Sequence, residues 1–219
     1  MSKPKKIVVA NTKGGVAKST TVRNLATIAA ADGLTVATVD LDTQRTLSRW
    51  VDRRPSEANR ITHFDATMAD VADLDAIANV DVVIIDTPPL VTESDSAEQR
   101  LHGLHRLMTF ADLFVVPTLQ QIEDVEATTA FMRVLGKAGV RSFSLLSATT
   151  RRTNSYNDAK RKLALAGMLC PIDIQRLEDI AHTSRQGIGI NELHRGKGQD
   201  DFVAVWQFAK KEIGLAGEY

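Results

Sequence analysis

Five short runs rich in valine and isoleucine alternate with longer stretches that have helical periodicity, and this alternation restricts the fold of the chain. The apolar runs predict strands at residues 6–10, 35–40, 81–86, 113–118 and 142–148. Helices are expected at about 18–31, 43–53, 69–78, 95–109, 121–137, 155–166, 176–185 and 200–214. Nearly continuous apolar runs are typical of strands buried on both faces of a parallel sheet. We therefore expect an α/β fold, an open, mostly parallel twisted sheet with helices on both faces.

The chain is expected to form one domain. Its 219 residues fit an ordinary single domain, and no repeat, low-complexity tract or linker divides them. We therefore expect one domain over residues 1–219, with the last helix, at about 200–214, docked on it.

Charge and cysteine content limit the possible functions. With 27 basic and 27 acidic side chains, binding to nucleic acid would need a local basic patch rather than a net field. The single cysteine, Cys170, excludes a disulfide framework. No apolar run reaches the ~18 residues of a membrane-spanning helix, and the first residues lack a signal-peptide core. We expect a cytoplasmic protein with no membrane partner.

The stretch "VVANTKGGVAKSTT" after the first predicted strand indicates a phosphate-binding loop with displaced glycines. In the common pattern G-x-x-x-x-G-K-[ST], backbone amides hold phosphates, the lysine pairs with them and the hydroxyl binds Mg²⁺. With Lys18 and Ser19 at the start of a helix, Lys18 would neutralise phosphates, Ser19 would bind Mg²⁺ and Thr20 would contact the α-phosphate. The amides expected to point at the anion are those of Gly14, Gly15, Val16, Ala17, Lys18, Ser19 and Thr20. The alternative is a Gly-Gly turn beside a surface lysine.

Ala17 and Thr12 occupy the two glycine positions of the common pattern. If the backbone at Ala17 needs a positive φ, alanine costs roughly 1–2 kcal/mol there. A helical φ would make alanine harmless, so the loop can form on either interpretation.

Acidic residues end two of the predicted strands. Asp86 closes "DVVIID", where a carboxylate at the end of a buried strand can hold Mg²⁺ through water. Asp40 and Asp42 lie two residues apart and so on the same face of a strand. We expect Asp42 to orient an attacking water and Asp40 to help arrange Mg²⁺. The alternative is structural, with Asp86 as a turn cap and the "DLD" pair capping the next helix.

Taken together, these motifs resemble those of the ParA/MinD family of deviant-Walker ATPases. That family's loop, K-G-G-x-x-K-[ST], is similar to "KGGVAKS" at 13–19, although Ala17 stands where the family usually has glycine. "DLDTQ" at 40–44 and "IIDTPP" at 84–89 match its next two motifs. The resemblance runs from Lys5 to about Thr118 and is looser towards the C-terminus, where "GIGINELH" resembles the family's tail.

The resemblance implies a P-loop ATPase that uses ATP and Mg²⁺ and forms a homodimer on binding ATP. Lys13 would reach across the dimer to the partner's phosphates, which would link nucleotide binding to dimerisation. Gly14 would lie where the two loops approach each other. Lys18 and Asp42 would serve hydrolysis, and Asp86 would serve Mg²⁺. Pro117 and "TTRRTN" fall where family members contact adenine.

Among the branches of the family, the small DNA-partition ATPases of plasmids and chromosomes resemble this chain most. They bind non-specific DNA as ATP dimers on the nucleoid and are released when a centromere-bound partner protein stimulates hydrolysis. A lone Cys170 does not suit the clustered cysteines of nitrogenase iron proteins, and Glu212 and Glu218 dilute the basic face of a membrane-binding tail. Two alternatives stay open, a MinD-like positioning ATPase at a membrane surface and a metabolic ATP-dependent ligase or synthetase.

Basic residues in the C-terminal third are candidates for the DNA contact, whereas residues 65–81 carry only acidic charges. Solvated helix faces produce such basic runs as well, which is the alternative explanation. The candidates are Arg152, Lys160, Arg161, Arg185, Arg195 and Lys197, near Arg151 and Lys162.

Overall fold

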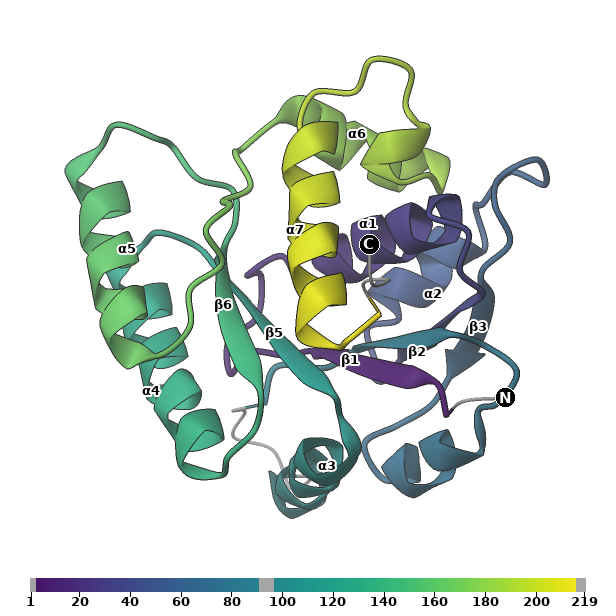
Figure 1. The fold of residues 1–219 in the computed structure, drawn as a ribbon, viewed down its shortest axis with the longest axis horizontal. Helices are drawn as coiled ribbons and strands as arrows, with labels where there is room; N and C mark the ends of the chain where they lie inside the picture. Colours follow the sequence, from purple (N-terminus) through teal and green to yellow (C-terminus); the bar gives the residue numbers. More distant parts are fainter. Residues whose placement is uncertain (1–2, 91–96, 216–219) are drawn as a thin grey trace.

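The computed structural model describes residues 3–90 and 97–215, and these contain one six-stranded sheet whose strand pairs are all parallel (Figure 1). Its strands lie in the order β3-β2-β4-β1-β5-β6. They are β1 (Lys5–Val9), β2 (Val36–Asp40), β3 (Thr62–Asp65), β4 (Val82–Asp86), β5 (Leu113–Thr118) and β6 (Ser142–Leu146). The predicted α/β fold with a parallel sheet is confirmed.

Helices cover both faces of this sheet (Figure 1). The face carrying Ile7 and Val9 packs against α1, α2, α6 and α7, and the opposite face packs against η1, α3 and α4. Beyond β6, α5 packs on α4. The helices are α1 (Lys18–Ala31), α2 (Thr46–Val51), η1 (Asp70–Ala76), α3 (Ala97–Phe110), α4 (Ile122–Lys137), α5 (Asn154–Ala166), α6 (Glu178–Gln186), η2 (Ile190–Glu192) and α7 (Gln199–Glu212).

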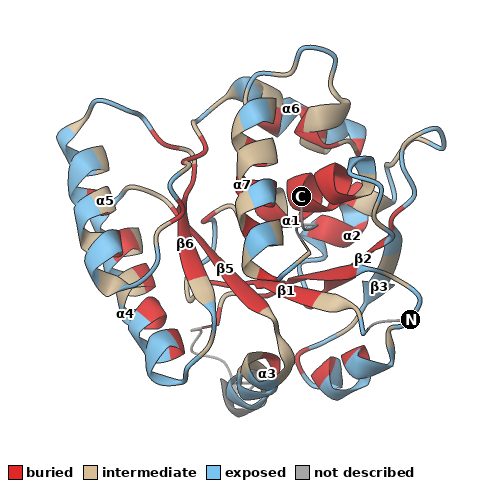
Figure 2. Ribbon diagram, viewed as in Figure 1, coloured by how far each residue is buried: buried red, intermediate tan, exposed pale blue. Residues whose placement is uncertain are grey.

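The sheet forms the centre of the core because alternate residues of its strands face two apolar layers. In β1, Ile7 and Val9 face one layer and Val8 faces the other, and none of the three is accessible to solvent. Figure 2 shows the central strands as almost entirely buried. This burial explains why the strands are nearly continuous apolar runs in the sequence.

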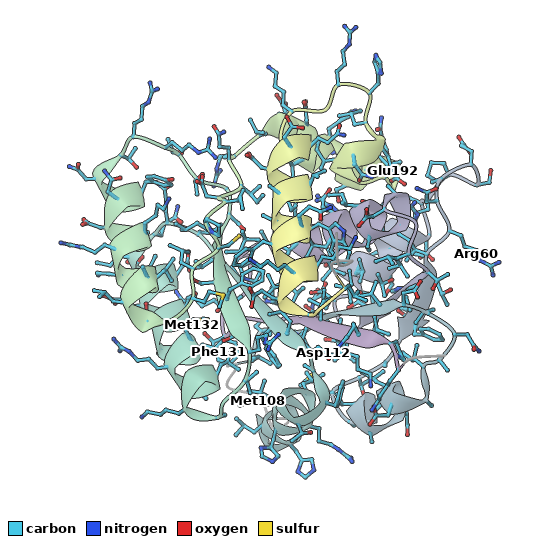
Figure 3. The ribbon with its side chains drawn as sticks, in the orientation of Figure 1. Arg60, Met108, Asp112, Phe131, Met132 and Glu192 are labelled. Atoms are coloured by element: carbon cyan, nitrogen blue, oxygen red, sulfur yellow. The ribbon has the colours of Figure 1, made fainter. Side chains whose placement is uncertain are left out.

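The apolar layer on the α3 and α4 face of the sheet contains aromatic and methionine side chains among its aliphatic ones. Phe131 and Met132 of α4 are buried there, and Met108 of α3 packs against the same cluster (Figure 3).

Asp112, which follows α3, accepts hydrogen bonds from the Lys6 amide at 2.8 Å and from Lys5 Nζ at 3.2 Å. This carboxylate therefore joins the start of β1 to the turn before β5.

Three elements differ from the expectations. Strand β3 was not expected, because this edge strand exposes most of its residues and has no apolar run. Residues 70–76 form a 3₁₀ helix, in which Val71 and Leu74 are buried at the three-residue spacing of such a helix. Helix α2 begins at Thr46 rather than at 43, because Arg45 before it has a left-handed backbone with a φ of 51°.

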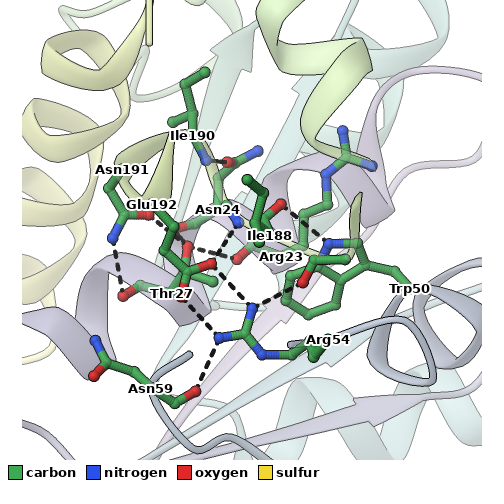
Figure 4. Close-up of polar contacts among 12 residues, drawn as sticks. Arg23, Asn24, Thr27, Trp50, Arg54, Asn59, Ile188, Ile190, Asn191 and Glu192 are labelled. Atoms are coloured by element: carbon green, nitrogen blue, oxygen red, sulfur yellow. Dashed lines mark hydrogen bonds and ion pairs between the residues drawn. The ribbon is translucent and has the colours of Figure 1, made fainter. Parts of the chain in front are cut away.

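The segment that contains "GIGINELH" is held against α1 and α2 by polar contacts (Figure 4). Asn24 Oδ1 accepts from the Ile190 amide at 2.8 Å, and Thr27 Oγ1 donates to Asn191 Oδ1 at 2.7 Å. On α2, Trp50 Nε1 donates to the Ile188 carbonyl at 3.2 Å. These contacts fix the position of α1, the helix that carries the phosphate loop at its start.

Helix α7 packs its apolar side into the core. Phe202, Val205, Trp206 and Ala209 are buried. At the end of α1, Asp32 Oδ2 accepts from Trp206 Nε1 at 3.0 Å and from Lys210 Nζ at 2.8 Å. Within the described residues, no helix combines the length and apolarity needed to cross a membrane.

Candidate functional site

Strand register brings the sequence motifs together at the carboxyl edge of the sheet. Val9, the last residue of β1, pairs with Asp86 of β4, and Asp86 in turn pairs with Asp40 of β2. The Thr87 hydroxyl, which follows β4, donates to the Val9 carbonyl at 3.1 Å. Since ligands of open α/β sheets bind beyond the carboxyl ends of the strands, this edge is the candidate site.

Asn11 anchors the base of the loop that follows β1. This buried side chain donates from Nδ2 to the Pro117 carbonyl and to Thr128 Oγ1, both at 2.8 Å. Its Oδ1 accepts from the Lys13 amide at 3.1 Å. The loop is thereby fixed to β5 and α4.

Lys18 stands at the start of α1 and points back across the loop. Its Nζ donates to the Lys13 carbonyl at 2.9 Å, and the side chain is buried. Burial lowers the pKa of Lys18, and the nearby carboxylates of Asp86 and Asp42 oppose this change. A buried ammonium beside free amides at a helix N-terminus is a strong site for a phosphate.

Ala17 has a left-handed backbone, with a φ of 71°, immediately before α1. Gly15 has a φ of 76°, so the loop needs two left-handed residues and has a glycine at only one of them. Of the two interpretations of Ala17, the strained one therefore holds, and the loop forms in spite of the cost.

Replacing Ala17 with glycine is expected to raise the free energy of unfolding by about 1 kcal/mol. The change removes the steric cost of a left-handed Cβ, and the greater freedom of glycine in the unfolded chain offsets part of the gain. Chemical denaturation would measure it. As a control, Ala164→Gly in the exposed part of α5 should lower stability by a similar amount. If both variants were less stable than the wild type, the backbone strain inferred at Ala17 would be contradicted.

Asp86 is a buried carboxylate at the end of β4. The residue is 1% exposed, and neither Oδ1 nor Oδ2 has a hydrogen-bond partner among residues 3–90 and 97–215. Burial raises its pKa to about 7, with Asp40 and Asp42 adding to the rise and the Ser19 hydroxyl and Lys18 ammonium opposing it. An orphaned carboxylate near a serine hydroxyl is a donor set that fits a hard cation such as Mg²⁺.

The other two acidic residues have different environments. Asp40 is buried, and its Oδ2 accepts from the Leu47 and Ser48 amides and the Ser48 hydroxyl, each at 3.0 Å. Its Oδ1 accepts from the Asp42 amide at 2.9 Å. Asp40 therefore caps α2, as the structural alternative expected, and its help in arranging Mg²⁺ stays a prediction. Asp42 is only partly buried, and its Oδ1 accepts from the Gln44 amide at 2.9 Å, while Oδ2 has no hydrogen bond among the described contacts.

Lys13 is paired within its own chain. Its Nζ lies 3.5 Å from Asp124 Oδ1 in the first turn of α4, and the lysine side chain is 42% exposed. Gly14 beside it is exposed, and a Cβ there would lie 3.4 Å from Pro89 Cγ. The extra lysine is thus at the surface, where it can exchange its partner.

A cavity of about 200 Å³ lies beside the phosphate loop. Ala17 and Thr20 form one side of it, and Ser147 and Ala148, just before "TTRRTN", form part of another. Pro117 is not among its lining residues; it is buried in β5, with its carbonyl bonded to Asn11. The contact of Pro117 and "TTRRTN" with adenine stays a prediction.

The basic residues named from the sequence fall into two groups. Arg151 is held by Asp173, with Nε 3.0 Å from Oδ2, and Arg161 pairs with Asp158 at 3.0 Å. Lys160 lies over the Tyr156 ring at 5.4 Å. The exposed residues with no ion pair among the described contacts are Arg152, Arg185, Arg195 and Lys197. Their loops and α6 lie along the upper edge of Figure 1, and contact with DNA stays a prediction.

The sequence interpretation missed Asn11 and Asp124. Asn11 stands inside the quoted loop stretch, where a polar residue directly after a buried strand was a usable signal. Asp124 gave none, because an acidic residue in the first turn of a helix is common.

Residues 7–194 match the model of one protein family, described as the CobQ/CobB/MinD/ParA nucleotide binding domain. Among curated proteins, the maintenance of carboxysome distribution protein A of Gloeobacter kilaueensis is 33% identical over 117 residues, which are 53% of this chain and 50% of that protein. The chain therefore aligns with about half the length of this relative.

Solved structures with the same fold cover nearly the whole chain. One is a putative plasmid partition protein of Borrelia burgdorferi bound to AMPPNP, with a TM-score of 0.75, 17% identity and coverage of 95% of this chain and 100% of that one. Another is the septum site-determining protein MinD of Pyrococcus horikoshii with Mg-ADP, with a TM-score of 0.77, 17% identity and coverage of 99% and 100%. At this identity the likeness shows the fold alone.

Proposed function

Because the chain belongs to the CobQ/CobB/MinD/ParA nucleotide-binding family, we propose that it is a DNA-partition ATPase that dimerises on binding Mg-ATP. In this proposal the ATP-bound dimer binds non-specific DNA on the nucleoid in the cytoplasm. A centromere-bound partner protein then stimulates hydrolysis to ADP and phosphate and releases the dimer.

The observation that carries the nucleotide site is the buried carboxylate of Asp86, which has no hydrogen-bond partner in the described part of the chain. Ser19 would hold Mg²⁺ directly and Asp86 through water, and the ion would supply positive charge against the phosphates. Lys18 would exchange its bond to the Lys13 carbonyl for the phosphates. Asp42, with one oxygen free, would orient the attacking water.

The surface position of Lys13 supports the dimer. Within one chain its only described ionic partner is Asp124, at 3.5 Å and with 42% of the lysine side chain exposed. The Asp124 side chain is only 16% exposed, but 3.5 Å is long for an ion pair, and a partner's triphosphate would offer Lys13 more negative charge than this one carboxylate. A cation supplied by the second subunit would make nucleotide binding and dimerisation thermodynamically linked.

Partition is favoured over the two alternatives by particular residues. The apolar side of α7 is buried in the core, so those side chains are not free to enter a membrane surface. A metabolic ligase has no need of an exposed lysine next to its phosphate loop. The plasmid partition protein of similar fold agrees with the proposal. The similarity to MinD and to the carboxysome-distribution protein leaves the positioning of another cargo as an alternative.

DNA binding that depends on ATP tests the proposal. We expect the wild-type chain to shift bulk double-stranded DNA with Mg-ATP but not with Mg-ADP or without nucleotide. Raising the salt concentration should weaken binding steeply, because phosphate contacts release counterions. Asp42→Ala should keep the chain on DNA by slowing hydrolysis.

The controls separate the three candidate functions. Liposomes in place of DNA test the positioning ATPase, and ATPase activity that requires an added metabolite would indicate a ligase. Binding to DNA that is equal with and without nucleotide would refute the proposed switch.

A further inference from the structure

Arg23 is a buried cation without a described carboxylate partner. It lies on α1, and the residue is only 5% exposed. One terminal nitrogen donates to the Ile180 carbonyl at 2.7 Å, whereas neither the second terminal nitrogen nor the buried Nε has a hydrogen-bond partner among the described residues. In Figure 4 its side chain takes no part in the dashed network that joins Asn24, Trp50 and Arg54.

The surroundings of Arg23 make this arrangement unfavourable in the free protein. Burial, and to a lesser extent the positive charge of Arg53, lower its pKa to about 10, so the side chain is still cationic at neutral pH. A buried charge without a partner lowers stability, and an unpaired buried N–H adds to the loss. Such a group is expected where a ligand supplies the missing acceptor.

Arg23 also lines the cavity beside the phosphate loop. Thr20 and Thr21 lie between it and the loop on the same helix and line the same space, as do Ile180 and Phe202. The volume of about 200 Å³ suits a ring system rather than a whole nucleotide, since sites for larger ligands enclose roughly 300–1,000 Å³. A nucleotide with its phosphates on the loop would direct its base towards this space.

We propose that Arg23 is a specificity-determining residue whose second terminal N–H donates a hydrogen bond to a ring nitrogen of the purine in this cavity. The proposal rests on the proposed function, because it takes ATP as the ligand. The exocyclic amine of adenine is a donor, which leaves the ring nitrogens as the acceptors that suit a cationic N–H.

If the role of Arg23 were purely structural, replacing it would lower the stability of the nucleotide-free protein. Its bond to the Ile180 carbonyl is the one described contact that would stabilise the free protein. That carbonyl also accepts from Thr183 Oγ1 at 3.0 Å, so it keeps a partner when the arginine is removed. Arg23→Met should therefore leave the free energy of unfolding of the nucleotide-free protein unchanged or higher.

Calorimetric titration with four nucleotides tests the proposal. The ligands are Mg-ATP and its 1-deaza, 3-deaza and 7-deaza analogues, each of which lacks one ring nitrogen. For the wild type, one analogue should bind about tenfold more weakly than ATP, as expected for the loss of a charge-assisted hydrogen bond. Arg23→Met should bind ATP about tenfold more weakly and should not distinguish that analogue from ATP. Arg176→Met, which removes an exposed cation from the same cavity, should keep the wild-type ranking.

Three results would overturn the inference. The first is an equal affinity of the wild type for ATP and all three analogues. The second is a loss in Arg23→Met that is the same for every ligand, and the third is a marked fall in its stability without nucleotide. If the wild type binds no ATP at all, the proposed function fails as well, which distinguishes the two failures.

Discussion

Lys18→Ala is expected to lower the affinity of the chain for Mg-ATP by about a hundredfold or more while the fold stays intact. Lys18 is buried at the start of α1, and its ammonium is bonded to the Lys13 carbonyl of the loop itself. Removing one partner of a buried charge pair costs about 2–5 kcal/mol of binding free energy. Titration calorimetry measures the affinity, and circular dichroism with thermal unfolding checks the fold.

Lys13→Ala provides the matched comparison, because it removes the other lysine of the same loop. Its side chain is 42% exposed and paired with Asp124, so the single subunit should bind ATP as the wild type does. The Lys13→Ala variant should lose ATP-dependent dimerisation, and it should therefore also lose ATP turnover. Light scattering with and without ATP would show the difference.

Asp124→Asn completes this test by releasing Lys13 from its partner in the same chain. Dimerisation with ATP should then be as strong as in the wild type or stronger. If Lys13→Ala forms dimers and hydrolyses ATP normally, the role of this lysine across the dimer is wrong. If Lys18→Ala keeps its affinity, the phosphate site itself is wrong.

The fold could be predicted from the sequence wherever a strand is buried on both faces. The five apolar runs match β1, β2, β4, β5 and β6, because burial in a parallel sheet requires continuous apolar residues. Strand β3 could not be found in this way. Its position at the edge of the sheet exposes Phe64, and its neighbours His63 and Asp65 are polar.

The candidate site could be predicted only as far as its residues are close in sequence or end neighbouring strands. Register alone brings Asp40 and Asp86 together, and it follows from the strand order. Contacts between distant parts were out of reach, such as Lys13 with Asp124 or Arg23 with the Ile180 carbonyl. They depend on where α4 and α6 pack, which no local pattern specifies.

Glu192→Ala is expected to lower the free energy of unfolding by about 3 kcal/mol or more, the loss typical of breaking a buried ion pair. Arg54 and Glu192 form a two-pronged pair, with nitrogen–oxygen distances of 2.8 and 3.1 Å (Figure 4). Their side chains are only 8% and 15% exposed. For a chain of this length, the loss corresponds to about 10 °C in melting temperature.

The loss should be large because Glu192 accepts hydrogen bonds from a backbone amide as well as from Arg54. Its Oε2 also accepts from the Gly189 amide at 2.7 Å, and truncation would leave both donors without this acceptor. Arg54 would keep its bonds to the Gly187 and Asn59 carbonyls and its place 4.9 Å from the Trp50 ring. Those contacts hold the side chain in place, so its charge would remain buried without a counter-charge.

Two control variants identify the cause of the loss. Asp158→Ala breaks the pair with Arg161 on the surface of α5, where the side chains are 60% and 72% exposed, and should change stability by less than about 1 kcal/mol. The double variant Arg54→Met with Glu192→Met removes both charges and should recover part of the lost stability, because no charge is left without a counter-charge. The recovery should be incomplete, since the Gly189 amide and the Gly187 and Asn59 carbonyls also lose a hydrogen-bond partner. Thermal unfolding of the four proteins, wild type included, would measure this. If Glu192→Ala is no worse than Asp158→Ala, the ion pair does not hold "GIGINELH" against the turn that follows α2. If the double variant is as unstable as the single one, the loss comes from packing and from the lost backbone hydrogen bonds rather than from an unpaired charge.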